Sequence, residues 1–217
     1  MIFPPITPDT YIISDTHLAH KNITHFEPSR LEKMYSMGYT NHDKFIKDNW
    51  NNTVLPDSNV LHLGDLAFKD LDNQIKDLNG HKTLILGNHD RKPLHQAYTN
   101  NNWITVNGLY FLDKYTFKFQ TRETEVQDDM LFSAIIAPYK GKRVLFSHYP
   151  VFENDNYDFK NPKISSRIRT LENLFQYYGC DYCVHGHSHS RKNTKSFNIN
   201  VSLEQTDFKP IRLGEIL

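Results

Sequence analysis

Five short apolar segments of the chain each lead directly into polar residues that could bind a metal or transfer a proton. The segments cover residues 11–13, 60–63, 83–86, 144–146 and 182–184, and their composition is typical of short strands. The polar residues that follow them are Asp15, His17, Asp65, Asn88, His89, Asp90, His148, His187 and His189. Ligands collect at the carboxyl ends of strands in open α/β sheets, so we expect the five clusters to converge on one place.

Each cluster, taken alone, has an ordinary structural explanation. An Asp after a strand commonly caps a turn, a His there is commonly a hydrogen-bonded loop residue, and Gly-Asn is normal turn chemistry. That explanation does not account for all five clusters occurring in this order, each at the end of a strand. We therefore interpret the set as one site.

The mixture of side chains suits two divalent cations. Imidazole favours manganese, iron or zinc, whereas carboxylate favours harder ions, so the mixture favours Mn²⁺, with Fe, Zn²⁺ or Ni²⁺ as alternatives. Asp65 is the natural bridge between the two, because a carboxylate can bind both cations and neutralise part of their charge. Only two Asp residues face two divalent ions, so such a site would attract an anionic substrate and a hydroxide, as phosphate-ester hydrolysis requires.

In their order, the clusters resemble the signature motifs of the calcineurin-like metallophosphoesterase superfamily: D-x-H, G-D, G-N-H-D, a strand-end His and G-H-x-H. The resemblance extends from residue 11 to about residue 205 and is closest to a branch of small cytoplasmic or phage phosphoesterases. It implies that one metal is held by Asp15, His17, Asp65 and His189. It implies that the second metal is held by Asp65, Asn88, His148 and His187.

The resemblance also implies the roles of residues that do not bind metal. A hydroxide bridging the two metals would attack phosphorus, His89 would protonate the leaving group, and Asp90 would orient the His89 imidazole.

For His20 and Asn22, which follow the first motif, a contact with phosphate or leaving group and a role at a helix N-cap are equally open. Tyr149 and Phe152 could form a base-stacking wall. A structural role is expected for the histidines outside the motifs, His25, His42, His62, His81, His95 and His185.

The elements that would position these residues indicate an α/β (α+β) fold. The clearest helix covers residues 164–178, where apolar residues recur every three or four positions and Gly179 follows as a stop. Residues 103–137 contain strand-like pieces, with a charged hairpin loop expected from Gln120 to Asp129. The resemblance implies a four-layer αββα sandwich of two mixed sheets, and the length of 217 residues predicts a single domain over residues 1–217.

The composition of the chain bears on which classes of partner it could bind. The 25 basic and 25 acidic residues balance, so no global charge predicts a nucleic-acid or membrane partner. The chain contains neither a long apolar run nor a signal-peptide pattern, and its two cysteines suit ordinary thiols in a reducing compartment. We therefore expect a cytoplasmic protein without a membrane partner; the oligomeric state stays open.

Two departures from the superfamily pattern bear on the substrate. Its Ser/Thr protein phosphatases carry an Arg shortly after the G-D motif and end the third motif in Glu. This chain has residues 66–69, Leu-Ala-Phe-Lys, after Asp65 and ends the third motif in Asp90. The departures favour a phosphodiesterase acting on a cyclic nucleotide, a dinucleotide or a short nucleic-acid end. The expected partner is thus a phosphorylated small molecule or nucleotide. A phosphomonoesterase, including a protein phosphatase, and a non-catalytic scaffold are the alternatives.

Overall fold

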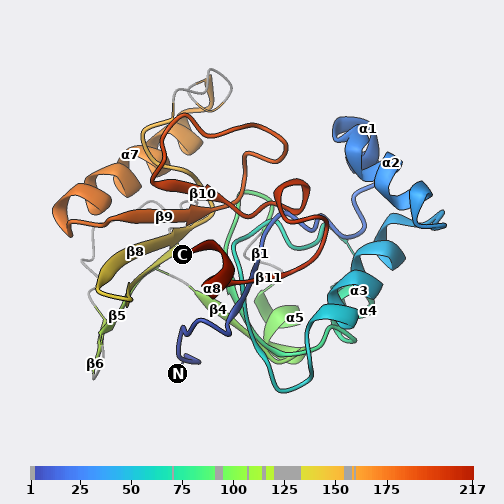
Figure 1. The fold of residues 1–217 in the computed structure, drawn as a ribbon, viewed down its shortest axis with the longest axis horizontal. Coiled ribbons are helices and arrows are strands. Elements are labelled where there is room, and N and C mark those ends of the chain that lie inside the picture. The colour runs from blue at the N-terminus through green and yellow to red at the C-terminus, as the bar shows by residue number, and fades with distance from the viewer. Residues whose placement is uncertain are drawn as a thin grey trace.

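The protein was analysed as a computed structural model that describes residues 3–69, 71–90, 95–106, 108–113, 116–119, 133–153, 158 and 160–217. Its strands form two mixed sheets (Figure 1). The first sheet has the strand order β11 (Ile211–Arg212), β1 (Tyr11–Ile13), β2 (Asn59–His62), β3 (His81–Ile85) and β4 (Trp103–Val106). The second has the order β10 (Asn198–Asn200), β9 (Tyr182–His185), β8 (Lys142–Ser147), β7 (Ser133–Tyr139), β5 (Gly108–Asp113) and β6 (Thr116–Phe119).

Helices cover the outer faces of both sheets. The first sheet is flanked by α2 (Pro28–Ser36) and α3 (His42–Thr53), with α4 (Leu71–Ile75) and α5 (His95–Asn100) nearby. The second sheet is covered by α7 (Pro162–Tyr177) on the opposite side of the molecule (Figure 1). Shorter helices are α1 (Ile23–Phe26), α8 (Leu213–Ile216) and the 3₁₀ helix η2 (Leu203–Gln205).

Three apolar cores explain this layering, because neighbouring residues of a strand point to opposite faces. On β1, Tyr11 and Ile13 pack toward the helices of the first sheet, whereas Ile12 packs into the core between the sheets. On β8, Leu145 packs toward α7 and Phe146 into the core between the sheets. The order helix, sheet, sheet, helix confirms the predicted four-layer αββα sandwich.

The parallel strands share one direction, which places their ends together. In the first sheet, β1, β2, β3 and β4 are parallel and only β11 pairs antiparallel. In the second, β8, β9 and β10 are parallel, whereas β7 is antiparallel to β8. The carboxyl ends of β1, β2, β3, β8 and β9 carry the predicted motifs.

The predicted helix over residues 164–178 is confirmed as α7. It begins two residues earlier because the Asn161 side chain accepts hydrogen bonds from the Lys163 and Ile164 N–H groups, and Pro162 suits the first turn. Gly179 ends it with φ of +58°. The strand-like pieces of residues 103–137 are confirmed as β5, β6 and β7. The hairpin loop expected from Gln120 to Asp129 lies outside the described residues.

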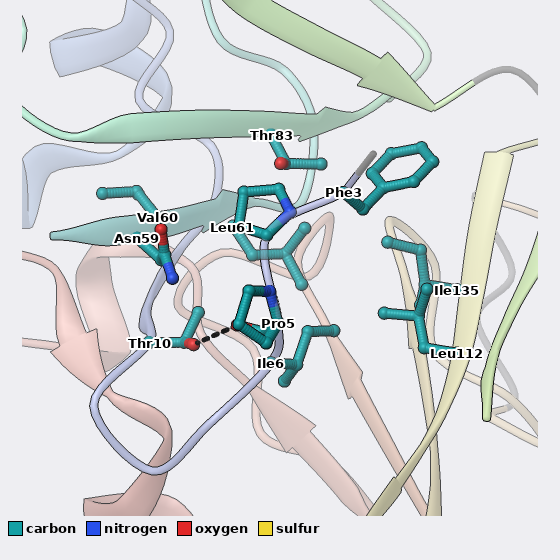
Figure 2. Close-up of a pocket in the computed structure, with 11 residues that line it drawn as sticks. Phe3, Pro5, Ile6, Thr10, Asn59, Val60, Leu61, Thr83, Leu112 and Ile135 are labelled. Carbon is teal, nitrogen blue, oxygen red and sulfur yellow. Dashed lines mark hydrogen bonds between the residues drawn. The ribbon is translucent and has the colours of Figure 1, made fainter. Parts of the chain in front are cut away.

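A small pocket lies between the two sheets beneath the N-terminal segment (Figure 2). Its lining is mainly apolar and includes Phe3, Leu61 and Ile135, and Thr10 donates a hydrogen bond of 3.4 Å to the Pro5 carbonyl at its edge. The chain's own residues 3–6 close it, so we interpret it as a gap in packing. Among the described residues, no helix has the length and apolar character needed to span a bilayer.

Candidate metal centre

The loops that follow the strands turn sharply at the predicted ligands themselves. Five of these ligands have positive φ, between 47° and 64°: Asp15, His17, Asp65, His187 and His189. Asp and His enter this left-handed region more readily than most residues other than Gly. The turns let successive side chains point back toward the sheet ends rather than away from them.

Two motif glycines are required by close approach. A Cβ atom on Gly87 would overlap the Asp65 carboxylate, and one on Gly186 would overlap Ser14 and the Asp15 carboxylate. The glycines of the G-N-H-D and G-H-x-H motifs therefore allow these two loops to pack directly against the acidic ligands.

Asp65 lies at the centre of the site. Its Oδ1 accepts the backbone N–H of His89 at 2.9 Å. Its Oδ2 lies 3.7 Å from His17 Nε2 and 3.6 Å from His148 Nε2. His89 Nε2 lies 3.9 Å from the same oxygen. All three separations are too long for hydrogen bonds, so this oxygen faces three imidazole nitrogens without bonding any of them.

Asp15 forms a second focus with His17 and His189. Asp15 Oδ2 accepts hydrogen bonds from the His187 backbone N–H at 2.8 Å and the Ser202 hydroxyl at 3.0 Å. Its Oδ1 lies 3.6 Å from His17 Nε2 and 3.7 Å from His189 Nε2. Asp15 Oδ1 and both His17 ring nitrogens are buried with no hydrogen-bond partner. Buried polar atoms are rarely left unpaired, and a cation would satisfy these.

The candidate ligands His148 and Asn88 also face each other in a way that a hydrogen bond does not explain. The Leu63 carbonyl lies 2.8 Å from His148 Nδ1 and can only accept, so the neutral ring carries its proton there. The Nε2 lone pair then faces the Asn88 Oδ1 acceptor at 3.0 Å. Burial lowers the pKa of His148, which favours this neutral form. Two acceptor atoms in contact fit a shared cation, so the donor set fits divalent metal ions.

Residues outside the motifs hold the outer nitrogens of two His ligands. Asp158 Oδ1 lies 2.8 Å from His187 Nε2, and Glu204 Oε1 lies 3.2 Å from His189 Nδ1. Carboxylates in this position fix the ring orientation of a metal ligand and raise its basicity. Neither carboxylate was predicted from the sequence, because neither Asp158 nor Glu204 stands at a distinctive spacing from a motif.

Arg30 on α2 ties this support to the first motif. Its guanidinium is fully buried and donates to Glu204 Oε1 at 2.6 Å, to the Asp15 carbonyl at 2.7 Å and to the Thr16 carbonyl at 3.3 Å. Glu27, His189 and Glu204 also form a group with metal-ligand spacing. Arg30 Nη2 lies 3.3 Å from His189 Nδ1, so its guanidinium already supplies the positive charge there.

The charges of this network are strongly coupled. Burial would raise the pKa of Glu204, but the Arg30 charge and His189 outweigh burial and lower it to about 2. Burial would lower the pKa of His189, but Glu204 and Asp15 raise it to about 9. A metal at His189 Nε2 would therefore have to displace a proton.

Asp90 does not orient His89 as predicted. Its carboxylate accepts the backbone N–H groups of Asp65, Leu66 and Gly87 at 2.7–3.1 Å and the Tyr98 hydroxyl at 3.0 Å. Burial and the nearby Asp65 raise the pKa of Asp90 to about 7. Asp90 is 3% exposed and faces the loop after β2, so it fixes the backbone of the G-D motif and not the His89 ring.

His89 lies at the edge of the site. Its side chain is 41% exposed, and its Nε2 lies 3.9 Å from Asp65 Oδ2, which is too long for a hydrogen bond. Its ring packs against Phe68 with centroids 4.6 Å apart. Packing rather than a hydrogen bond therefore sets its orientation.

His20 and Asn22 lie at the rim. Asn22 holds the N-cap position of α1, but its side chain makes no capping hydrogen bond. Its backbone N–H donates to His20 Nδ1 at 3.3 Å, and the His20 ring packs edge-on against Phe68 at 4.2 Å. The two predicted interpretations therefore both stay open for these residues.

Two further expectations have clear outcomes. Tyr149 is buried, with its hydroxyl directed at Asn88 Oδ1 at 3.4 Å, and Phe152 packs against Phe175 in the core under α7. The predicted stacking wall of Tyr149 and Phe152 is therefore wrong. His62 has the expected structural role, because its ring contacts Thr16 Oγ1 at 3.1 Å and accepts the Gly64 N–H at 3.1 Å.

Fold and site together define a hydrolase of phosphate esters that depends on divalent metal ions. The chain belongs to the calcineurin-like phosphoesterase family, whose sequence profile matches residues 9–191. It is similar to the uncharacterized protein MJ1445 of Methanocaldococcus jannaschii, with 26% identity over 219 residues, 95% of this chain and 88% of that protein.

Solved structures give similar matches. A protein of unknown function from Aquifex aeolicus, AQ665, is 26% identical with a TM-score of 0.65, covering 95% of this chain and 96% of that one. An archaeal phosphodiesterase is 14% identical with a TM-score of 0.39, covering 89% of this chain and 81% of that one.

Proposed function

We propose that the protein is a phosphodiesterase whose centre holds two divalent metal ions bridged by Asp65. The observation that carries the proposal is the position of Asp65 Oδ2, 3.7 Å from His17 Nε2 and 3.6 Å from His148 Nε2. His17 belongs to one predicted ligand set and His148 to the other, so a single carboxylate oxygen faces both. Mn²⁺ suits this mixture of carboxylate and imidazole, with Fe, Zn²⁺ or Ni²⁺ as alternatives.

When bound, the ions would supply an activated water molecule and neutralise charge on the phosphate. The chain's own contribution to the leaving group is His89. Its backbone is held by Asp65, and its partly exposed ring lies beside the candidate metal ligands, with Nε2 3.9 Å from Asp65 Oδ2, where it could donate a proton to a departing oxygen. An intact His89 at this position supports an enzyme over a non-catalytic scaffold of the same fold.

The apolar surroundings of His89 support a diester over a monoester. Phe68 packs against both His17 and His89, so an apolar ring borders the site there. A phosphomonoester carries up to one more negative charge at neutral pH than a diester does, and would gain more from an additional cation. The expected substrate is a phosphorylated small molecule or nucleotide, or a nucleic-acid end. The free thiols of Cys180 and Cys183 support a reducing compartment such as the cytoplasm.

Two measurements test this proposal. Mn²⁺-loaded protein should hydrolyse bis-p-nitrophenyl phosphate with a higher kcat/KM than p-nitrophenyl phosphate; turnover of the monoester alone would contradict a diesterase. Metal analysis should find about two ions per chain. Asp65→Asn should bind fewer than one, whereas Asp57→Asn, which changes an exposed Asp, should keep the full content. One ion per chain in the wild type would contradict the binuclear centre.

A further inference from the structure

Aromatic rings form a continuous path from His89 to the protein surface. Phe68 lies 4.6 Å from His89 and 4.2 Å from His20, measured between ring centroids. Phe26 lies 5.9 Å from His20, and 63% of its surface is exposed. We call Phe26, His20 and Phe68 the aromatic shelf.

The shelf is anchored at both loops that build it. Phe68 donates its backbone N–H to the Leu18 carbonyl at 2.9 Å, and Leu18 and Ala67 form an isolated β-bridge. The Phe68 ring is also stacked on His17, with centroids 5.4 Å apart and planes 29° apart. The loop after β1 and the loop after β2 are thus joined, so Phe68, the inner ring of the shelf, has a fixed position relative to the candidate metal ligands.

The outer part of the shelf is exposed to solvent. Single exposed apolar side chains are normal on a protein surface, and Tyr177 is another. Phe26 differs from such a side chain because its ring contacts His20, which contacts Phe68 beside the candidate ligand His17. His20 presents a neutral edge as well, since its Nδ1 accepts the Asn22 N–H and the other nitrogen carries the proton.

We propose that the aromatic shelf binds an aromatic ring on the leaving-group side of the substrate, such as a nucleobase. The inference rests on the proposed function, because it takes His89 as the residue facing the leaving oxygen. A group attached beyond that oxygen would meet Phe68 and then Phe26. Aromatic side chains stack on any base, so the shelf would favour nucleotides without selecting one base.

The test compares AMP with ribose 5-phosphate, which keeps the sugar and phosphate but lacks the base. Binding of each to the Mn²⁺-loaded protein is measured by calorimetry, with free phosphate assayed in parallel. Wild type should bind AMP roughly 5- to 100-fold more tightly than ribose 5-phosphate, the range expected for stacking of one base. Phe26→Ala should reduce that ratio several-fold and leave ribose 5-phosphate binding unchanged.

Two variants provide controls. Phe26→Trp keeps an aromatic ring and should keep the ratio. Tyr177→Ala removes an exposed ring that ends α7 and contacts Tyr178, not the shelf, and this variant should also keep the ratio. Equal binding of the two ligands by wild type, or an unchanged ratio in Phe26→Ala, would overturn the proposal. Because binding is measured without turnover, failure to hydrolyse diesters would refute the proposed function while leaving this comparison intact.

Discussion

At the scale of single residues, His89 combines a fixed backbone with an exposed ring. Asp65 holds its N–H, and Phe68 supports one face of its imidazole. His89→Ala should keep the full metal content, because His89 is not a predicted ligand. Turnover should fall about 10²- to 10⁴-fold for diesters with alkoxide leaving groups, and much less for p-nitrophenolate, which needs little protonation. Equal losses for both leaving groups would argue against a proton donor.

Glu204 contacts the candidate ligand His189 from outside the predicted motifs, and a substitution can show whether it affects metal binding. Glu204→Gln keeps the shape of the side chain but removes the charge that orients His189 Nδ1. We expect metal affinity to fall about 10- to 100-fold at one of the two sites, since outer carboxylates tune ligands to this extent. A calorimetric titration of the metal-free protein with Mn²⁺ should show one weakened and one unchanged binding event. Glu215→Gln, at an exposed position of α8, is the matched control.

The candidate ligands could be picked out from the sequence, whereas the residues that support them could not. Residues such as Asp15 and His148 are recognisable because each follows a strand directly, so chain position indicates spatial position. Arg30 gave no such signal, because a charged residue on a helix is ordinarily exposed. Asp90 was identified but given the wrong role, because the side chains of consecutive residues can point apart: the His89 ring is partly exposed, whereas the Asp90 carboxylate is buried against the loop after β2.

At the scale of elements, a buried ion pair between Arg30 and Glu204 helps to hold α2 to the site. Arg30→Ala would leave Glu204 buried without its main partner, so we expect a loss of about 3–5 kcal/mol in the free energy of unfolding. Lys33 is on the same helix as Arg30 and forms a solvent-accessible ion pair with Asp207. Lys33→Ala removes that pair and should cost less than about 1 kcal/mol. Urea unfolding of both variants checks the contrast. Similar losses would show that the buried pair has no special role.

Helices with a strong local sequence pattern could be predicted, whereas the order in which strands pair within a sheet could not. α7 followed from its apolar spacing and from Gly179, because both are local properties of the chain. The pairing of β7 with β5 in parallel and with β8 antiparallel depends on contacts between distant segments. No local pattern records such partners, so the sheet order could come only from the resemblance.

At the scale of the whole molecule, the core between the sheets holds the two halves of the site together. Leu61 on β2 is buried there and also borders the small pocket beneath the N-terminal segment (Figure 2). Leu61→Ala should cost about 2–5 kcal/mol, because the new cavity adjoins an existing gap. Thermal or urea unfolding measures this loss, and metal content should be unchanged at 25 °C. Loss of metal by a folded variant would show that metal binding depends directly on the packing of the core between the sheets.

The left-handed ligand residues place stability and function in opposition. An L-residue other than Gly in that conformation costs roughly 1–2 kcal/mol, somewhat less for Asp, and Gly would relieve that cost at Asp15, His17, Asp65, His187 or His189. At Asp15 and Asp65 that gain is offset, because glycine would leave the donors to their carboxylates without an acceptor. Neither ring nitrogen of His17 has a hydrogen-bond partner, so a descendant that lost the need for catalysis would be expected to change toward glycine at His17 before Asp15 or Asp65.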